Sequence, residues 1–370
     1  MKVAVIQPLP GIGDMIWHLP HIRAIATHLG VPVTVLTKPR SAADQIFSGE
    51  PLVRDVMWLN RNPDEGAGDH DGTGMIRLIA ALRARRFDAA YLLHHSKSLA
   101  FLLALAGIPA RYGYGFGVQR LFLNRGPFLP APVLRMHPYD QATAWVAAAS
   151  IPMADPEPTL TADQELRRGL NLVPGTYVAI GIGSSEAYKQ WGADRFATLT
   201  RALLASGWSR VILIGGTAEA ELAGAIRART EALADRIEIA AGWNLGRIIA
   251  LLADAGFYVG NDTGVMNIAA AAGLRSYGLF GATPALRHSA RILPIIPPGG
   301  IDRDHGMARI TCDQVLATVA ADRGEIGPRA EGAIVPRAGG AIVPRADGAI
   351  RPRADGAIRP REPDVNEPLA

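Results

Sequence analysis

The segment 255–283, AGFYVGNDTGVMNIAAAAGLRSYGLFGAT, constrains the fold of this chain more than any other segment. An apolar run ends at Gly260, the polar turn 261–264 follows, a helix is predicted to about Ala272, and Ser276–Phe280 has the composition of a second buried strand. This order predicts a βαβ unit of a parallel sheet. Free N–H groups where the helix begins favour an anion such as phosphate, although a well-capped βαβ unit without a ligand has the same pattern.

Strands alternate with helices along most of the chain, which indicates parallel sheets with both faces covered. The other predicted strands are Val3–Gln7, Val31–Leu36, Val53–Leu59, Ala89–Leu93, Arg111–Gly113, Tyr177–Gly183 and Arg210–Gly215. The other predicted helices are Met15–Leu29, Ser41–Phe47, Met75–Arg86, Ser98–Ala106, Tyr139–Ala149, Asp194–Ala205, Ala218–Leu233 and Leu245–Ala253. Residues 60–74, rich in Asp and Gly, are expected to form a loop.

The Pro-rich stretch 151–160 divides this series into two halves. We therefore predict two Rossmann-like, doubly wound α/β domains, at 1–155 and 156–324, with ligands at the carboxyl ends of the strands. Residues 325–370 form a Pro/Arg/Gly/Ala-rich tail in which proline recurs every eight residues from Pro328. Proline at this density blocks helices and central strands, so the tail is expected to be disordered.

Composition limits the class of protein and its compartment. A single cysteine in 370 residues excludes an internal disulfide framework and fits the cytoplasm. The longest apolar stretch, Leu99–Ala110, is too short to span a bilayer, so any membrane contact is expected to be peripheral, at the inner membrane face. No basic tract interleaved with aromatic residues is present, and nucleic acid is not an expected partner.

The first predicted turn contains Gly11, Gly13 and Asp14. It lacks the third glycine of a dinucleotide fingerprint, so we expect the two glycines to bring the backbone close to another group in the cleft. Asp14 has two interpretations. It is either the N-cap of a helix that begins at Met15 or a general base that accepts a proton from a hydroxyl nucleophile.

A second candidate site follows the strand that ends near Gly183. Ser184 and Ser185 offer donors for phosphate oxygens, and Lys189 adds a cation, although a solvated surface lysine is the alternative. Trp191 indicates that this loop is packed down. Glu219 is placed to bind both hydroxyls of a ribose, but glutamate at a helix N-terminus is common because of the helix dipole alone.

No metal site and no cofactor are predicted. His94 and His95 are consecutive, and neither an HExxH sequence nor a paired Cys/His spacing is present.

Four segments, GIGD at 11–14, SSEAYKQW at 184–191, GGTAE at 215–219 and GNDTGVMNIAAAAG at 260–273, together resemble glycosyltransferase family 9, the heptosyltransferases of lipopolysaccharide assembly. The resemblance extends over about residues 1–322. It implies a GT-B fold, with the acceptor on the N-terminal domain and a nucleotide sugar on the C-terminal domain. It also implies a metal-independent, inverting displacement.

The resemblance also implies roles for individual residues. Asp14 matches the catalytic base. Lys189 matches a residue that holds the diphosphate and stabilises it as it leaves. The remaining donor-binding matches are Ser184, Ser185, Glu219, Asp262, Thr263, Gly264 and Asn267. Asn267 stands where the family commonly has histidine, and Leu274-Arg275 stands where a proline often follows the glycine, which puts the exact donor in doubt. Gly13, Lys97 and Arg120 are the candidates for acceptor binding.

The expected activity is transfer of a heptose or related sugar from a nucleotide diphosphate, with ADP-heptose the expected donor, to a lipopolysaccharide core or similar phosphorylated glycolipid or glycan. Two alternatives stay open. The first is a family member that glycosylates a protein or another surface polysaccharide. The second is a catalytically idle GT-B protein that binds a nucleotide sugar as a scaffold or sensor.

Overall fold

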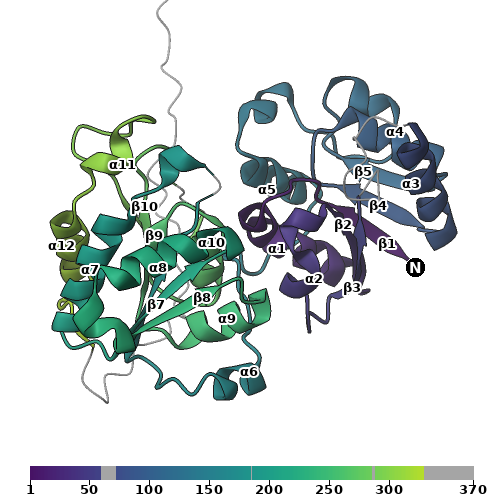
Figure 1. Ribbon diagram of the computed structural model, residues 1–370. Coiled ribbons are helices and arrows are strands. Elements are labelled where there is room, and N and C mark those ends of the chain that lie inside the picture. Colours follow the sequence, from purple (N-terminus) through teal and green to yellow (C-terminus); the bar gives the residue numbers. More distant parts are fainter. Residues whose placement is uncertain (60–71, 185, 286–287, 329–370) are drawn as a thin grey trace, which may run out of the picture. The chain divides into compact units, whose positions relative to one another are not determined.

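Two parallel β-sheets organise the computed structural model, which describes residues 1–59, 72–184, 186–285 and 288–328 (Figure 1). The first sheet has the order β3-β2-β1-β4-β5. Its strands are β1 (Val3–Ile6), β2 (Val33–Thr37), β3 (Val53–Trp58), β4 (Ala89–Leu92) and β5 (Ala110–Gly113). The strand order changes direction between β1 and β4, which is where ligands bind in open α/β sheets.

Helices cover both faces of this first sheet, as its alternating side chains require. Val3 and Val5 pack with α1 (Ile12–Leu29), α2 (Ala43–Ile46) and α5 (Pro138–Ala148). Ala4 and Ile6 pack with α3 (Gly72–Arg85) and α4 (Lys97–Leu105) on the other face. The short 3-10 helices are η1 (Pro39–Ser41), η2 (Gly117–Leu121) and η3 (Ala131–Arg135).

The second sheet has the order β11-β10-β9-β6-β7-β8. Its strands are β6 (Tyr177–Gly181), β7 (Arg210–Gly215), β8 (Ile237–Ala241), β9 (Tyr258–Asn261), β10 (Ser276–Leu279) and β11 (Ile292–Ile295). One face packs with α9 (Leu245–Asp254) and α10 (Gly264–Ala271), and the other with α7 (Ala193–Ala205), α8 (Ala220–Ala228) and α12 (Cys312–Arg323). The smaller elements are α6 (Gln164–Gly169), α11 (Gly306–Arg309), η4 (Ala187–Lys189), η5 (Thr217–Glu219) and η6 (Glu231–Arg236).

The predicted βαβ unit at 255–283 is confirmed as β9, α10 and β10. One predicted helix and one loop boundary differ from the structure, and two strands were not predicted. The helix predicted at 218–233 is broken into η5, α8 and η6, and β8 and β11 were not predicted because Glu238 and Pro294 interrupt their apolar residues. Of the loop predicted at 60–74, residues 60–71 lie outside the described residues, and α3 already begins at Gly72.

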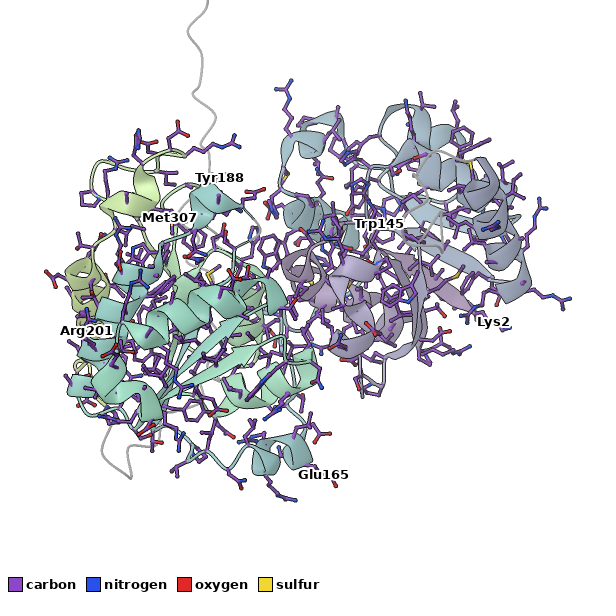
Figure 2. The ribbon with its side chains drawn as sticks, in the orientation of Figure 1. Lys2, Trp145, Glu165, Tyr188, Arg201 and Met307 are labelled. Carbon is purple, nitrogen blue, oxygen red and sulfur yellow. The ribbon has the colours of Figure 1, made fainter. Side chains whose placement is uncertain are left out.

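One hydrophobic core runs from the α1 face of the first sheet to the α9 and α10 face of the second. The side chain of Trp145 on α5, labelled in Figure 2, is buried in it and donates through Nε1 to the Gly113 carbonyl at 3.0 Å. The chain from Met1 to Arg329 accordingly forms one compact unit. The predicted domain boundary at 155/156 stays a prediction, and nearly all of the predicted tail lies outside the described residues.

The Pro-rich stretch 151–160 contacts elements of both sheets. Arg23 on α1 donates to the Thr159 carbonyl at 2.9 Å, and the Leu160 amide donates to the carbonyl of Ala271 on α10 at 2.7 Å. Near the other end of the described chain, Trp208 Nε1 donates to the Ile326 carbonyl at 2.7 Å. The packed chain therefore extends into the segment that was assigned to the tail.

Candidate functional site

The N-termini of α1 and α10 meet, one from each sheet. A Cβ added to Gly13 would lie 2.8 Å from Nδ2 of Asn267, and a Cβ added to Gly264 would lie 3.0 Å from Cβ of Ile12. Neither glycine has a positive φ, so proximity rather than backbone conformation requires glycine here. The predicted close approach is confirmed for Gly13, whose neighbour is α10, whereas Gly11 lies against Asp14 of its own turn.

Asn267 joins the two helices through its amide group. Its Oδ1 accepts from Nε1 of Trp17 at 2.8 Å, and its Nδ2 donates to the Thr263 carbonyl at 3.2 Å. The side chain is only 4% exposed. Both amide atoms therefore have protein partners, and the contact with Trp17 links residues that are 250 positions apart.

Asp14 occupies the first turn of α1, three residues after the N-cap position Gly11. Its Oδ2 accepts the Gly11 amide at 3.1 Å. The prediction that the helix begins at Met15 with Asp14 as its N-cap was wrong, because the turn Pro10-Gly11 already leads into the helix at Ile12. Burial raises the pKa of the Asp14 carboxyl, while the Gly11 amide and the positive charge of His137 lower it. A raised pKa makes the carboxylate a stronger base than an ordinary aspartate.

His18 contacts the main chain of Asp14, and two further histidines pack against Trp17 of the same helix. Nδ1 of His18 donates to the Asp14 carbonyl oxygen at 2.6 Å, and burial lowers the pKa of His18 to about 4. The imidazole is therefore neutral at pH 7 and holds the first turn of α1. His137 and His288 lie with ring centroids 4.7 Å apart, and each packs against Trp17.

Lys189 lies at the end of η4, beside the turn that follows β9. Its Nζ is 3.7 Å from Oδ2 of Asp262 and 3.8 Å from Oε2 of Glu186. Asp262 also accepts the hydroxyl of Thr283 at 2.7 Å. Arg303 lies over the ring of Tyr188, the residue before Lys189, at 4.5 Å, and Figure 2 labels this tyrosine on η4. The structure thus brings two predicted donor residues, Lys189 and Asp262, together.

The turn that starts α10 contains a buried hydroxyl group, that of Thr263. Thr263 is the N-cap residue by position, but its side chain makes no capping bond. Its buried Oγ1 has no well-aligned partner among the described residues, although the Tyr258 hydroxyl lies close to it. The first amides of α10 lie at the positive end of the helix dipole, which favours an anion there.

The remaining predicted donor residues have local partners. The Ser184 hydroxyl donates to the Glu186 carbonyl at 2.6 Å, and Ser185 lies outside the described residues. Glu219 accepts the Gly216 amide at 2.7 Å through Oε2, which is the capping role expected for a glutamate at a helix N-terminus. Its contact with a ribose stays a prediction.

Asn261 and Gln190, which were not predicted as site residues, hold the turn after β9 in place. Nδ2 of Asn261 donates to the carbonyls of Ile182 and Gly183, both at 3.1 Å, and lies 3.2 Å from Oε1 of Gln190. These bonds join the ends of β6 and β9. The buried Trp191 next to Gln190 donates to the Ile310 carbonyl at 2.9 Å, which confirms that this loop is packed down.

A cavity of about 530 Å³ lies at the carboxyl ends of the strands in the first sheet. Lys38 and Arg40 line it together with His94, Ser96 and Ser98. Lys38 and Arg40 were not predicted as site residues, although both follow shortly after β2. Lys97 lines a neighbouring depression, and the Arg120 guanidinium lies over the Phe128 ring at 4.7 Å.

No group of three or more His, Cys, Asp or Glu residues suited to a metal ion occurs in the part of the chain that the structure describes. In the Asp-x-Asp sequence at 302–304, the first carboxylate accepts hydrogen bonds from the protein itself. Asp302 accepts the Asp304 and His305 amides at 3.0 and 3.3 Å.

The two Rossmann-like parallel sheets have the GT-B fold, which the E. coli ADP-heptose LPS heptosyltransferase II structure also has. The model of glycosyltransferase family 9 (heptosyltransferase) matches residues 75–293, and the chain belongs to this family.

Lipopolysaccharide heptosyltransferase 2 of Escherichia coli is 27% identical over 319 residues, covering 80% of this chain and 88% of the relative. The structure of E. coli ADP-heptose LPS heptosyltransferase II has a TM-score of 0.68 at 21% identity, covering 87% of this chain and 98% of the other. An E. coli heptosyltransferase solved with ADP-2-deoxy-2-fluoro heptose also has a TM-score of 0.68, at 18% identity, covering 87% of this chain and all of the other. These structural similarities support the predicted fold.

Proposed function

We propose that this glycosyltransferase moves a heptose from ADP-heptose to a lipopolysaccharide core, by a metal-independent displacement that inverts the anomeric centre. The contact between the first turns of α1 and α10 carries the proposal. Asp14 follows Gly13 in α1 and Thr263 precedes Gly264 of α10, so this contact supports a base and a donor turn that act beside one small region. The expected donor follows from the curated relative and from the structure that holds an ADP-heptose analogue.

The proposed reaction transfers one proton and releases one leaving group. The acceptor hydroxyl oxygen forms a bond to the anomeric carbon and gives its proton to the Asp14 carboxylate. The bond between the anomeric carbon and the phosphate oxygen breaks, and its electron pair leaves with ADP. Attack opposite to the leaving group inverts the centre. The raised pKa of Asp14 favours this proton transfer.

Charge on the departing ADP needs stabilisation from the second sheet. Lys189 supplies a cation beside the turn, and the α10 amides supply hydrogen-bond donors. When the diphosphate binds, we expect the Lys189 ammonium to exchange Glu186 and Asp262, which it contacts at 3.7–3.8 Å, for phosphate oxygens. Binding in a region that excludes water strengthens these interactions and protects the donor from hydrolysis.

We place the reaction in the cytoplasm, at the inner membrane face, where a phosphorylated glycolipid acceptor would lie. No helix among the described residues is long and apolar enough to cross a membrane.

Release of ADP from ADP-heptose, measured with and without an acceptor extracted from a heptose-deficient lipopolysaccharide, tests the proposal. We expect release that depends on the acceptor and does not fall when EDTA is added. Asp14→Asn should lower kcat by about 10²-fold or more while the Kd for ADP-heptose changes little. Tight donor binding without turnover on any glycan would favour the sensor alternative. An Asp14→Asn enzyme with normal kcat would disprove the base assignment.

A further inference from the structure

The segment 89–139, which supplies β4, α4, η2 and η3, contains no acidic residue. The whole chain has 34 Asp and Glu residues, and none of them falls in this segment. It does contain Lys97, Arg111, Arg120, Arg125 and Arg135. Arg111 donates to the carbonyls of Phe122 and Ile108 and is used within the protein. The segment's own charged side chains therefore all have the same sign.

The same segment also exposes an unusual share of apolar side chains. Of the twelve large hydrophobic residues that are exposed in the described part of the chain, six belong to it: Phe101, Leu105, Val118, Leu121, Leu134 and Met136. Leu121 is 79% exposed, more than any other of the twelve. Clusters of exposed apolar residues mark sites of contact with proteins or membranes.

These residues lie next to one another on three elements. The rings of Phe101 on α4 and Phe122 at the end of η2 have centroids 5.0 Å apart. A shallow depression of about 460 Å³ is lined by Lys97 on α4, Val118 on η2 and Leu134 on η3. We call the surface formed by Lys97, Phe101, Val118, Arg120, Leu121, Leu134 and Arg135 the α4–η2–η3 face.

The α4–η2–η3 face is continuous with the cavity at the strand ends of the first sheet. His94, Ser96 and Ser98 line both the shallow depression and the cavity that contains Lys38 and Arg40. The two regions therefore share one wall. An amphiphilic acceptor could place its polar head in the cavity while its lipid part remains beside the face.

We propose that the α4–η2–η3 face docks this protein onto an anionic lipid bilayer. Its exposed aliphatic and aromatic side chains would enter the boundary between headgroups and acyl chains, and its cations would pair with anionic headgroups. The role of the neighbouring cavity in acceptor binding rests on the proposed function, whereas bilayer binding itself does not. Self-association through this face would bring like charges together and is disfavoured.

Co-sedimentation of the full-length protein with vesicles tests the proposal, with no donor or acceptor present. One set of vesicles contains phosphatidylcholine alone, and the other contains phosphatidylcholine with phosphatidylglycerol. We expect binding to the anionic vesicles that is stronger than binding to the neutral vesicles and that weakens as salt is raised. The repeat tail, which also carries arginines, is present in every sample, so differences between variants report on the face.

Three substitutions on the face and one control locate the binding surface. Leu121→Glu and Val118→Glu should each lower the vesicle partition constant about tenfold or more, and Arg135→Ala about fivefold. Val173→Glu introduces the same charge at a side chain that is 62% exposed outside the segment, and it should bind like the wild type. Turnover of a water-soluble, deacylated acceptor should be unchanged in all four variants.

Three results would each overturn the proposal. The first is no binding of the wild type to anionic vesicles, and the second is an equal loss of vesicle binding in Val173→Glu. The third is a dimer in light scattering that Leu121→Glu dissociates while vesicle binding is unaffected. Circular dichroism shows whether each variant is folded. If Leu121→Glu does not fold, Val118→Glu supplies the test. Vesicle binding without any glycosyl transfer would refute the proposed function and leave the docking surface intact.

Discussion

Replacing Gly13 by alanine tests the contact between the two helices, because the new methyl group and the Asn267 amide cannot occupy their present positions together. The added Cβ would lie 2.8 Å from Nδ2 of Asn267. The amide must then turn away and leave Nε1 of Trp17 without its partner at 2.8 Å. Crowding costs about 1–3 kcal/mol, and a buried donor without a partner costs about 1–3 kcal/mol.

Alanine also favours a helix over glycine by about 0.5–1 kcal/mol, so we expect Gly13→Ala to lower the free energy of unfolding by about 1–5 kcal/mol. The effect should reverse when Asn267 is absent. Asn267→Ala alone loses the bond to Trp17 and should cost about 1–3 kcal/mol. In that background the new methyl group has room, and Gly13→Ala should be neutral or stabilise by up to about 1 kcal/mol.

Urea denaturation of the four proteins in this double-mutant cycle, followed by tryptophan fluorescence and circular dichroism, measures the coupling. Gly224→Ala is a matched control, because Gly224 lies within α8 and a Cβ there meets no atom within 4 Å. It should stabilise the protein by about 0.5–1 kcal/mol. If Gly13→Ala costs the same with and without Asn267, the close approach of α1 and α10 is not what requires glycine.

Three further predictions concern charge. Lys189→Ala should raise the Kd for ADP about tenfold or more in calorimetry, because the diphosphate loses a charge-assisted bond; an unchanged Kd would exclude Lys189 from the donor site. Lys38→Ala and Arg40→Ala should each raise KM for a phosphorylated acceptor several-fold and leave KM for the donor unchanged, whereas a change in the donor KM alone would contradict an acceptor cavity. Folding stability should fall as pH drops from 6.5 towards 4, because the unfolded chain protonates His18 at its ordinary pKa while the folded protein resists protonation until about 4. This difference corresponds to about 3 kcal/mol that is fully present above pH 6.5, and His18→Gln should flatten that part of the profile in thermal melts.

Local patterns predicted much of the fold because their signals are short in range. The turn at 261–264 between an apolar strand and an alanine-rich helix specified its βαβ unit almost to the residue. Trp191 was recognised as packed because a large aromatic residue in a small polar turn needs a buried surface. Both inferences required only neighbouring residues.

Contacts between distant segments could not be predicted in the same way. Nothing near Asn267 in the sequence indicates that its amide pairs with Trp17, and nothing near Gly13 indicates which atom it approaches. The start of α1 was placed three residues late because Pro10-Gly11 was assigned to the turn rather than to the entry of the helix. For the candidate site, residue types and order indicated Asp14, Lys189 and Asp262, whereas the positions of Lys38 and Arg40 on one cavity depend on the sheet order.

The opposed glycines at 13 and 264 also limit how the two sheets can move. Any rearrangement that keeps this contact is a rotation about it, since sliding would drive the Ile12 side chain or the Asn267 amide into the opposite backbone. Atoms beside a rotation axis travel far less than atoms at the periphery. Asp14 and Thr263, each one residue along the chain from a glycine of this contact, would therefore move less than the cavity lined by Lys38 and Arg40.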